Sequence, residues 1–286
     1  MPVAPRAGDT VGGHRLLRPI GRGAASVVWL AQAAGSDAAV ALKLVPMHGR
    51  DTEADAADFL AAARRAASLV HPDILTVHDA GRHGRSGEWC WLSMEAVPGS
   101  DLSRYTTPTR LLPERLVLRL LRRLALALAH AHARGIVHRD LKPANVLVHW
   151  PASTLKLADF GLARSADAEP TRSGLLLGSP AYMAPEQLAG ALPTPATDFH
   201  ALGVLGFELL AGRLPYQGDS MGQLLQAVAT QTPPELHRLR PGVPQTLAAC
   251  VAALLAKQPA ARPVDGDQLA TDLECIDRAW PASQDA

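Results

Sequence analysis

Three side chains suited to phosphoryl transfer lie close together in the segment HRDLKPAN, residues 138–145. The Asp140 carboxylate could orient a hydroxyl, the Lys142 ammonium could neutralise a moving phosphoryl group, and the Asn145 amide oxygen could bind a metal ion. A DFG triplet farther along the chain offers a second metal-binding carboxylate, Asp159, beside a flexible glycine. Taken singly, each segment is equally consistent with an ordinary polar turn.

Two segments nearer the N-terminus could contact phosphate groups. Residues 21–28 read GRGAASVV, in which Gly21 and Gly23 would let the backbone approach a phosphate, although such a turn is more often a plain hairpin. Because a strand-like run follows and no Gly-Lys-Ser/Thr occurs, the segment is neither a Rossmann fingerprint nor a Walker loop. Lys43 ends the apolar run VALK, where an amine must either reach solvent or bind an anion.

The first third of the chain reads as antiparallel strands with one helix. Short apolar runs separated by turn residues occupy 14–44, and two more lie near 75–78 and 89–96. An Ala-rich stretch over 52–69 predicts the helix, which ends before a His-Pro pair.

The remainder of the chain is helix-rich, because apolar residues recur there at helical spacing. We place the domain boundary after residue 97, which gives domains 1–97 and 98–286. The expected helices cover 113–135, 201–211, 221–230 and 245–256, and two short strands cover 146–148 and 155–157.

The composition excludes several classes of protein. Charged residues make up 19%, hydrophobic residues 48%, and the net charge is +1, so nothing favours disorder, nucleic-acid binding or an anionic membrane. The three cysteines are far apart and form no CxxC pair, which argues against a disulfide framework or a zinc ribbon. No signal peptide and no apolar stretch of roughly 18 residues is visible. We therefore expect a cytoplasmic protein with no nucleic-acid partner and no membrane segment.

Taken together and in this order, the motifs resemble those of the eukaryotic-type protein kinase family, specifically its bacterial Ser/Thr members. Further matches are MAPEQ at 183–187, Asp198 at the start of an apolar helix, and Arg262 near the C-terminus. The resemblance runs from about His14 to Asp277. It implies an α+β, bilobal protein kinase fold, with a small, mainly antiparallel β N-lobe containing one helix and a larger, mainly α-helical C-lobe.

The resemblance also implies a role for each matched residue. Asp140 would be the catalytic base, and Lys142 would contact the γ-phosphate. Asn145 and Asp159 would bind Mg²⁺ or Mn²⁺, and Lys43 would hold the α- and β-phosphates of ATP. The other expected nucleotide contacts are Ile20, Gly21, Gly23, Val28, Ala41, Glu95 and Val97, with Met94 as gatekeeper.

The resemblance favours proteins as substrates and a Ser/Thr acceptor over tyrosine, because Lys142 follows the base and GSPAY occupies 178–182. Thr171 and Ser173 match positions that bacterial relatives phosphorylate, and the fixed charge of Arg139 could anchor a phosphate there. We therefore expect autophosphorylation in this segment. The sequence does not identify the substrate or the upstream signal, which would arrive through a regulatory partner protein.

Other polar residues are expected to have structural roles. Arg262 would pair with Glu186, and Asp198 would hold the backbone of the catalytic loop. His130 and His132 are two residues apart, so on a helix they make a poor metal pair. A row of arginines on the first long C-terminal helix is interpreted as a solvated face: Arg115, Arg119, Arg122 and Arg123.

The sequence departs from the family pattern in the N-terminal helix. Where the family places the glutamate that pairs with the lysine, this chain has Ala62. Asp58, one turn earlier, could reach Lys43 only if the helix slid along its axis. Otherwise we expect Lys43 to pair with Asp159 in a weakly active resting state.

Two further functions remain open beside an active protein kinase. A nucleotide-binding pseudokinase that acts as a scaffold is favoured by Ala62 but opposed by the retention of Lys43, Asp140, Asn145 and Asp159. A small-molecule phosphotransferase of the antibiotic-kinase type is less consistent with the sequence, because it would lack Lys142 and the APE segment.

Overall fold

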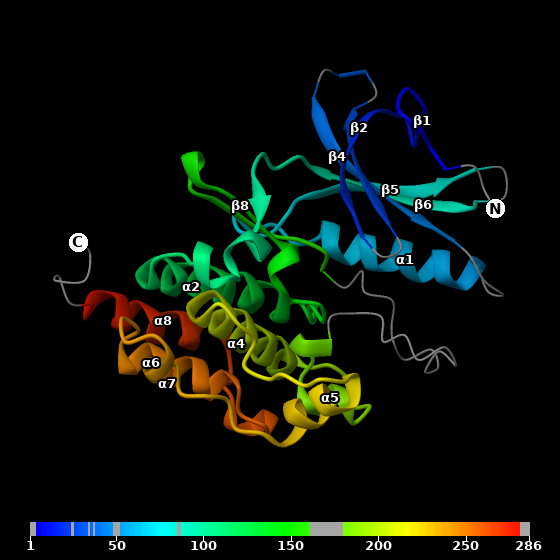
Figure 1. The fold of residues 1–286 in the computed structure, drawn as a ribbon. Coiled ribbons are helices and arrows are strands. Elements are labelled where there is room, and N and C mark those ends of the chain that lie inside the picture. The colour runs from blue at the N-terminus through cyan, green and yellow to red at the C-terminus, as the bar shows by residue number, and fades with distance from the viewer. Residues whose placement is uncertain are drawn as a thin grey trace. The chain divides into compact units, whose positions relative to one another are not determined.

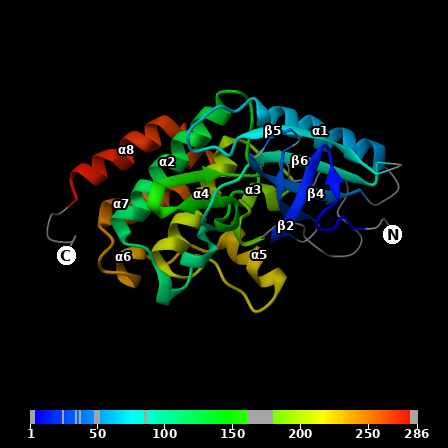
Figure 2. The same cartoon turned by 90° about the horizontal axis from the view of Figure 1, so that it is seen from above.

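The chain divides into two compact units, residues 1–98 and 99–286, one residue beyond the boundary placed from the sequence. Figures 1 and 2 show the helices and strands of both units. The computed structural model describes residues 4–23, 26–33, 35–36, 38–47, 52–84, 87–160 and 180–280.

The N-terminal unit is an antiparallel sheet of six strands in the order β1-β2-β3-β4-β6-β5, with one helix, α1 (Thr52–Ala67), packed near its β5 edge. Figure 2 shows α1 lying along β5 and β6. The strands are β1 (Thr10–Val11), β2 (His14–Arg22), β3 (Val27–Gln32), β4 (Ala39–Pro46), β5 (Val77–His83) and β6 (Trp89–Glu95).

Alternation along β4 places Lys43 relative to the core of this unit. Val40, Leu42 and Leu44 belong to one buried apolar cluster with residues of β1, β2, β3 and β6. Because successive side chains of a strand point to opposite faces, Ala41 and Lys43 lie on the other face of the sheet. The core residues of this strand therefore fix the side on which the lysine is presented.

The strand expected near residues 75–78 was misplaced, since β5 runs over Val77–His83. Its polar residues obscure the pattern because β5 is an edge strand paired only with β6. Arg82 on this strand holds the first turn of α1, with Nη1 at 2.6 Å from Glu53 Oε2. The helix ends at Ala67, earlier than predicted.

The C-terminal unit is mainly helical and contains a three-stranded sheet in the order β7-β8-β9. No helix among the described residues is long and apolar enough to cross a bilayer. The strands are β7 (Ser100–Asp101), β8 (Val146–His149) and β9 (Thr154–Leu157). The helices are α2 (Glu114–His132), α3 (Pro185–Leu188), α4 (Pro195–Ala211), α5 (Met221–Thr230), α6 (Leu236–Leu239), α7 (Gln245–Leu254) and α8 (Gly266–Arg278).

Helix α4 is the centre of this unit and packs against α2 and α7. Most of its residues are buried, as the apolar pattern predicts. It begins at Pro195, before the predicted start at 201, because a proline with its fixed φ is well suited to a first helical turn. Gly203 lets α4 approach α7 closely, since a Cβ there would lie 2.7 Å from Leu254 Cβ.

The interpretation of the arginine row as a solvated face is incomplete: Arg119 is 55% exposed and Arg122 37% exposed, but the row also has partners within the chain. The row faces α8, to which the sequence analysis assigned no element, and both views show α8 beside α2 (Figures 1 and 2). Acidic residues of α8 neutralise three of the arginines, and a backbone carbonyl accepts from the fourth. The contacts are Arg115 Nε to Asp277 Oδ1 at 2.7 Å, Arg119 Nε to Asp277 Oδ2 at 3.0 Å, Arg122 Nη2 to Glu274 Oε2 at 3.0 Å and Arg123 Nη1 to Ser153 O at 2.9 Å.

Candidate active site

The three side chains singled out in segment 138–145 meet in the C-terminal unit. Lys142 Nζ donates to Asp140 Oδ2 at 2.6 Å. Asn145 Nδ2 donates to the same oxygen at 3.0 Å and to the Asp140 carbonyl at 2.7 Å. A 3-10 turn over Pro143–Asn145, which leads into β8, brings the amide back to the carboxylate.

This arrangement leaves two oxygen atoms able to interact with a ligand. Within the described part of the chain, no hydrogen bond reaches Asp140 Oδ1 or Asn145 Oδ1. The Asp140 and Lys142 side chains are 26% and 21% exposed, so solvent or a substrate can reach them. A free carboxylate oxygen beside an ammonium can accept a hydroxyl proton where negative charge must also be neutralised.

His138 joins the catalytic loop to the segment that contains Asp159. Its Nδ1 accepts from the Asp140 backbone N–H at 3.2 Å, so the proton must lie on Nε2, which donates to the Ala158 carbonyl at 2.8 Å. The ring is fully buried and meets Phe160 edge-on at 4.6 Å between centroids. The neutral imidazole therefore fixes the loop and residues 158–160 to each other.

Asp198 holds the backbone of the loop, as the resemblance implied. Its Oδ2 accepts from His138 N at 2.7 Å, and its Oδ1 accepts from Arg139 N at 2.9 Å. Arg139 has a φ of +72° and Asp159 a φ of +66°, a left-handed conformation that is strained for residues other than glycine. Strained backbone thus occurs at two of the positions that the sequence assigned to chemistry.

His132, in the last turn of α2, also contacts Asp198, with Nε2 at 2.8 Å from Oδ2. From the sequence, this histidine was judged only as one of a poor metal pair with His130, and the contact with Asp198 was not predicted. A signal was present: the left-handed Gly135 ends the helix a few residues before His138, so the last turn of α2 must lie near the loop.

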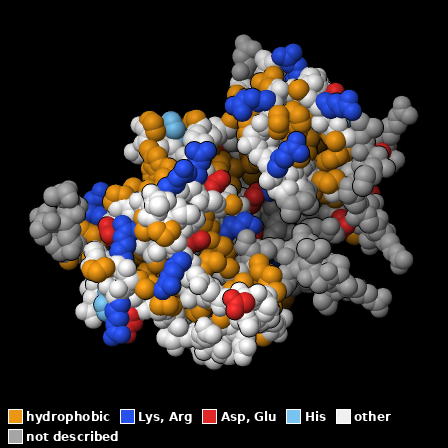
Figure 3. Space-filling view, viewed as in Figure 1, with side chains coloured by type: hydrophobic (Ala, Val, Ile, Leu, Met, Phe, Trp, Pro, Cys, Tyr) orange, Lys and Arg blue, Asp and Glu red, His pale blue; other side chains and the backbone are white. Residues whose placement is uncertain are grey.

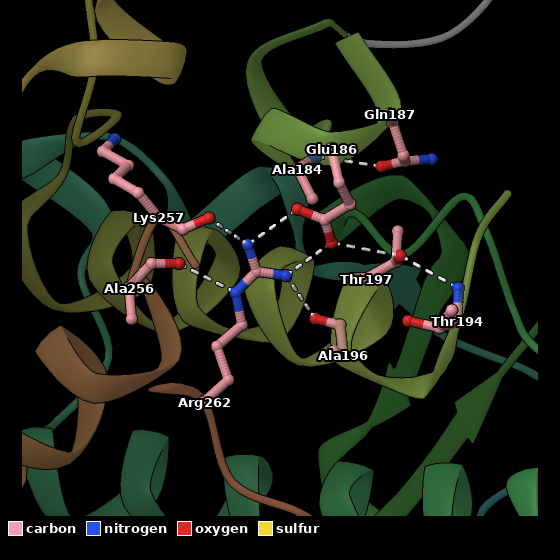
Figure 4. Close-up of polar contacts among 9 residues, drawn as sticks. All are labelled: Ala184, Glu186, Gln187, Thr194, Ala196, Thr197, Ala256, Lys257 and Arg262. Atoms are coloured by element: carbon pink, nitrogen blue, oxygen red, sulfur yellow. Dashed lines mark hydrogen bonds and ion pairs between the residues drawn. The ribbon is translucent and has the colours of Figure 1, made fainter. Parts of the chain in front are cut away.

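The pair formed by Glu186 and Arg262 lies at the centre of a saturated network, here called the Arg262 cluster (Figure 4). The Arg262 side chain is 0% exposed and that of Glu186 13%. All five guanidinium N–H groups donate hydrogen bonds. Nη1 donates to Glu186 at 2.6 Å and to the Ala196 carbonyl at 2.8 Å, and Nη2 donates to Glu186 at 2.8 Å and to the Lys257 carbonyl at 3.2 Å. Nε donates to the Ala256 carbonyl at 2.8 Å. Burial would raise the pKa of Glu186, but the hydrogen bonds and charge of Arg262 outweigh it and hold that pKa below its ordinary value.

Two titratable side chains border this cluster. His200 is fully buried, and burial, reinforced by the Arg262 charge, lowers its pKa to about 3, so the imidazole stays neutral. Burial and the same guanidinium lower the pKa of Lys257 to about 8. The Lys257 ammonium lies 3.8 Å from the Tyr216 ring centroid and donates to the Val228 carbonyl at 2.7 Å.

A second carboxylate, that of the half-buried Glu208, contacts residues 180–182. The Tyr182 hydroxyl donates to Glu208 of α4, a contact that the sequence analysis did not foresee. Burial raises the pKa of Tyr182, and the neighbouring carboxylate adds to the increase. The segment 180–182 is therefore tied to α4 independently of Arg262.

In the N-terminal unit, strand register aligns the expected phosphate-binding residues. Val28 on β3 pairs with Gly21 on β2 and with Lys43 on β4. On the next pair of strands, Ala41 lies opposite Met94. The register thus brings a glycine, a valine and the lysine side by side across three strands.

The other expected nucleotide contacts lie at the edges of this arrangement. Ile20 on β2 is 45% exposed, and Gly23 follows the same strand. Glu95 ends β6, where its Oε1 accepts from Thr76 N at 2.7 Å, and Val97 follows it. The phosphorylation candidates Thr171 and Ser173 lie outside the described residues.

Ala62 is 5% exposed and lies on the buried face of α1. The Asp58 side chain is exposed and makes no ion pair with any residue that the structure describes. The described contacts therefore do not support a shift of α1 along its axis that would bring Asp58 to Lys43.

Comparison with known proteins identifies close relatives. Residues 14–272 match the family described as protein kinase domain. The chain is 36% identical over 278 residues to the Ser/Thr-protein kinase PknA of Mycobacterium tuberculosis, covering 96% of this chain and 64% of PknA. It is 33% identical to the Ser/Thr-protein kinase PrkC of Bacillus subtilis, covering 92% of this chain and 40% of PrkC. The chain therefore spans less than two thirds of the length of these relatives.

The chain is also similar in fold to solved structures. The PknI kinase domain of Mycobacterium tuberculosis aligns with a TM-score of 0.76 at 32% identity, covering 95% of this chain and 98% of that one. The structure of Rad53 1-466 in complex with AMP-PNP aligns with the same TM-score of 0.76 at 23% identity, over 91% of this chain and 64% of that one. The second likeness concerns the fold alone.

Proposed function

Because this chain belongs to the protein kinase family and has its fold, we propose that it transfers the γ-phosphate of ATP to serine or threonine hydroxyls of proteins. The observation that carries the proposal is the convergence of Asp140, Lys142 and Asn145 through hydrogen bonds of 2.6 to 3.0 Å. The relatives named as Ser/Thr-protein kinases support the choice of acceptor.

In this mechanism Asp140 binds the acceptor hydroxyl at Oδ1 and takes its proton as the oxygen attacks the γ-phosphorus of ATP. The bond from that phosphorus to the β,γ-bridging oxygen breaks, and ADP leaves. Lys142 turns from Asp140 Oδ2 toward the transferring phosphoryl and neutralises the charge that develops on it. The Asp140 backbone is held by the Asn145 amide and by His138, so the carboxylate needs no reorganisation when the hydroxyl arrives.

The donor set fits a hard divalent cation together with ATP phosphates. Asn145 directs its Nδ2 at Asp140, which leaves its carbonyl oxygen as a ligand, and Asp159 provides a carboxylate. Mg²⁺ is commonly held by one or two protein oxygens with substrate phosphates and water. Asn145 and Asp159 would hold Mg²⁺ or Mn²⁺, which would neutralise charge on the phosphates. In the N-terminal unit, Lys43 and the backbone near Gly21 and Gly23 would bind the phosphates.

Autophosphorylation between Asp159 and Glu186 is part of the same proposal. Arg139 lies beside the base and keeps its charge at every physiological pH, so it can pair with a phosphate on Thr171 or Ser173. Mass spectrometry after incubation with ATP should detect phosphate on these residues. Active protein in which both remain unmodified would contradict this part.

A second function, a nucleotide-binding scaffold with weak or no activity, is favoured by one observation. Ala62, which stands where the family pattern has a glutamate, is buried on α1 and carries no charge. We propose weak basal activity that a regulatory partner protein or phosphorylation raises. Because the donor substrate is ATP, we place this activity in the cytoplasm.

One experiment separates the two functions. The chain is incubated with radiolabelled ATP, Mg²⁺ and a generic protein acceptor, and nucleotide binding is measured in parallel by thermal shift. Phosphate transfer that EDTA abolishes supports the kinase. A nucleotide-dependent thermal shift without transfer to the acceptor or to the chain itself would favour the scaffold.

A further inference from the structure

We infer that the side-chain amine of Lys257 is a site of covalent acylation by small acyl phosphates, and that this modification loosens the end of α5. Lys257 lies just after α7, outside the candidate active site, and is one of four lysines in the chain. It is partly exposed. Figure 4 shows its side chain directed away from the pair formed by Glu186 and Arg262.

Two neutral groups hold the Lys257 amine. Nζ donates to the Val228 carbonyl at 2.7 Å and lies 3.8 Å from the centroid of the Tyr216 ring. Val228 is in the last turn of α5, where carbonyls have no partner within the helix, so the lysine satisfies an otherwise unpaired acceptor. The Lys257 backbone carbonyl accepts from Arg262, and this residue therefore joins α5 to the Arg262 cluster.

No carboxylate pairs with the Lys257 amine among the residues that the structure describes. Neither α5 nor α7 contains a charged residue, and Glu186 is already paired with Arg262. Burial lowers the pKa of His200 to about 3 and raises that of Tyr216 to about 12, so both of these neighbouring groups are neutral at neutral pH. The charge that acts on Lys257 is therefore that of Arg262, which has the same sign.

These surroundings favour the neutral form of the amine. Partial burial, reinforced by the Arg262 charge, lowers the pKa of Lys257 to about 8 from its ordinary 10.5. At pH 7.5 about one quarter of such amines are neutral, against roughly 0.1% at the ordinary pKa. A neutral amine has a lone pair for attack on a carbonyl carbon, and it can still donate one N–H to Val228.

A small donor suits an amine that is only partly exposed, and an acyl phosphate carries its own leaving group. In the step, the Lys257 nitrogen attacks the carbonyl carbon and the bond from that carbon to the phosphate oxygen breaks. Inorganic phosphate leaves with the electron pair, and the nitrogen loses one proton to water. The product is a neutral amide, which ends the cation contact with the Tyr216 ring and places an acyl group beside the Val228 carbonyl.

Acetyl phosphate tests the site directly. The folded full chain is incubated with it at pH 7.5 together with N-acetyl-lysine amide, a model amine of ordinary pKa, and mass spectrometry follows each product. Lys257 should react at least about 10-fold faster than the model amine, because its larger neutral fraction outweighs its partial burial. It should also react faster than Lys156, which is likewise partly exposed. In guanidinium chloride the advantage should disappear, because the fold creates it.

The pH dependence of the same reaction gives a second test. The rate at Lys257 should rise with pH to about 8 and then level off, whereas the rate of the model amine should still rise above pH 9. A Lys257 rate that is no faster than that of the model amine, or that rises in parallel with it over the whole range, would overturn the inference.

The effect on α5 is tested with two matched variants. Lys257→Gln removes the charge, as acetylation does, and Lys257→Arg keeps a cation and a donor. Hydrogen exchange followed by mass spectrometry should show faster exchange in the last turn of α5 for the acetylated chain and for Lys257→Gln, with Lys257→Arg near wild type. Unchanged exchange in the acetylated chain would overturn the loosening of α5. None of these measurements requires phosphate transfer, so their outcome is independent of the proposed kinase function.

Discussion

The catalytic loop and the Arg262 cluster both pair a carboxylate with a cation, yet they leave the paired groups in opposite states. In the loop, Asp140 and Lys142 are 26% and 21% exposed, and one oxygen of the carboxylate has no partner among the described residues. In the cluster, Arg262 is 0% exposed and all five of its donors are satisfied.

The difference distinguishes a pair suited to catalysis, in the loop, from a pair that stabilises the fold, in the Arg262 cluster. A partly exposed pair with a free oxygen can exchange partners when a substrate arrives, whereas a saturated buried pair has no donor or acceptor left for a ligand. Substitutions in the loop should therefore change rates and leave stability nearly intact, and substitutions in the cluster should do the reverse.

Asp140→Asn should lower phosphate transfer by roughly 10²- to 10⁴-fold, the contribution of a positioned general base. The nucleotide contacts assigned to Lys43 and Asp159 are unchanged, so ATP affinity should stay near wild type. Radiolabel incorporation and a nucleotide titration measure the two effects. Undiminished turnover would remove Asp140 from its assigned role, and a large loss of melting temperature would show that the loop pair is structural.

Arg262→Ala should destabilise the fold by about 3–5 kcal/mol, because it leaves the Glu186 carboxylate buried without its cation. Chemical denaturation measures the loss. The matched control is Arg119→Ala, which breaks the pair with Asp277 at an arginine that is 55% exposed and should cost only about 0–1 kcal/mol. Similar losses of unfolding free energy in both variants would contradict the distinction between saturated and exposed pairs.

The Arg262 cluster should also make the fold sensitive to acid through His200. In the folded state burial lowers the pKa of His200 to about 3 from its ordinary 6.5, so the unfolded chain binds the proton more readily and stability falls as pH drops below 6.5. Between pH 7.5 and pH 5 the loss should be about 2 kcal/mol. Glu186 does not contribute between these two pH values, because its pKa is held below its ordinary value and so below pH 5.

His200→Phe should remove this part of the acid sensitivity, as measured by denaturation at the two pH values. His237→Phe, at an exposed histidine, serves as the control and should keep the wild-type slope. An unchanged slope in His200→Phe would mean that another group senses the acid.

The smallest effect is expected at α1, where Ala62→Glu should raise basal phosphorylation by about 1.5- to 5-fold, the range of an ion pair worth up to ~1 kcal/mol. Ala62→Gln supplies the same volume without charge and should not raise it. Asp58→Ala should change little, because that side chain is exposed. If Asp58→Ala abolishes activity and Ala62→Glu does nothing, a slid helix holds Lys43 instead.

Much of the fold and of the candidate site follows from local sequence. The alternation along β4 determines that Lys43 lies opposite a buried face, and the apolar run of α4 determines that this helix is buried. The loop from His138 to Asn145 closes on itself through contacts between neighbours in the chain, so the groups that meet there are already close in the sequence. Their residue types alone also fitted an ordinary polar turn, and it was the order of several motifs along the chain that indicated their chemistry.

The family resemblance predicted two contacts between distant segments, that of Glu186 with Arg262 and that of Asp198 with the catalytic loop, but others were decided only by the tertiary structure. A carboxylate of α8 neutralises arginines of α2, and His132 reaches Asp198 across a large separation in sequence. A sequence pattern reports which face of a helix is polar, but it does not report whether that face meets water or an opposite charge. The exposure and saturation of a pair depend on everything packed around it, and for that reason only the structure distinguishes the exchangeable charges of the loop from the fixed charges around Arg262. On the face drawn in Figure 3, basic side chains are scattered among apolar and acidic ones, and residue type alone does not tell which of these charges is paired.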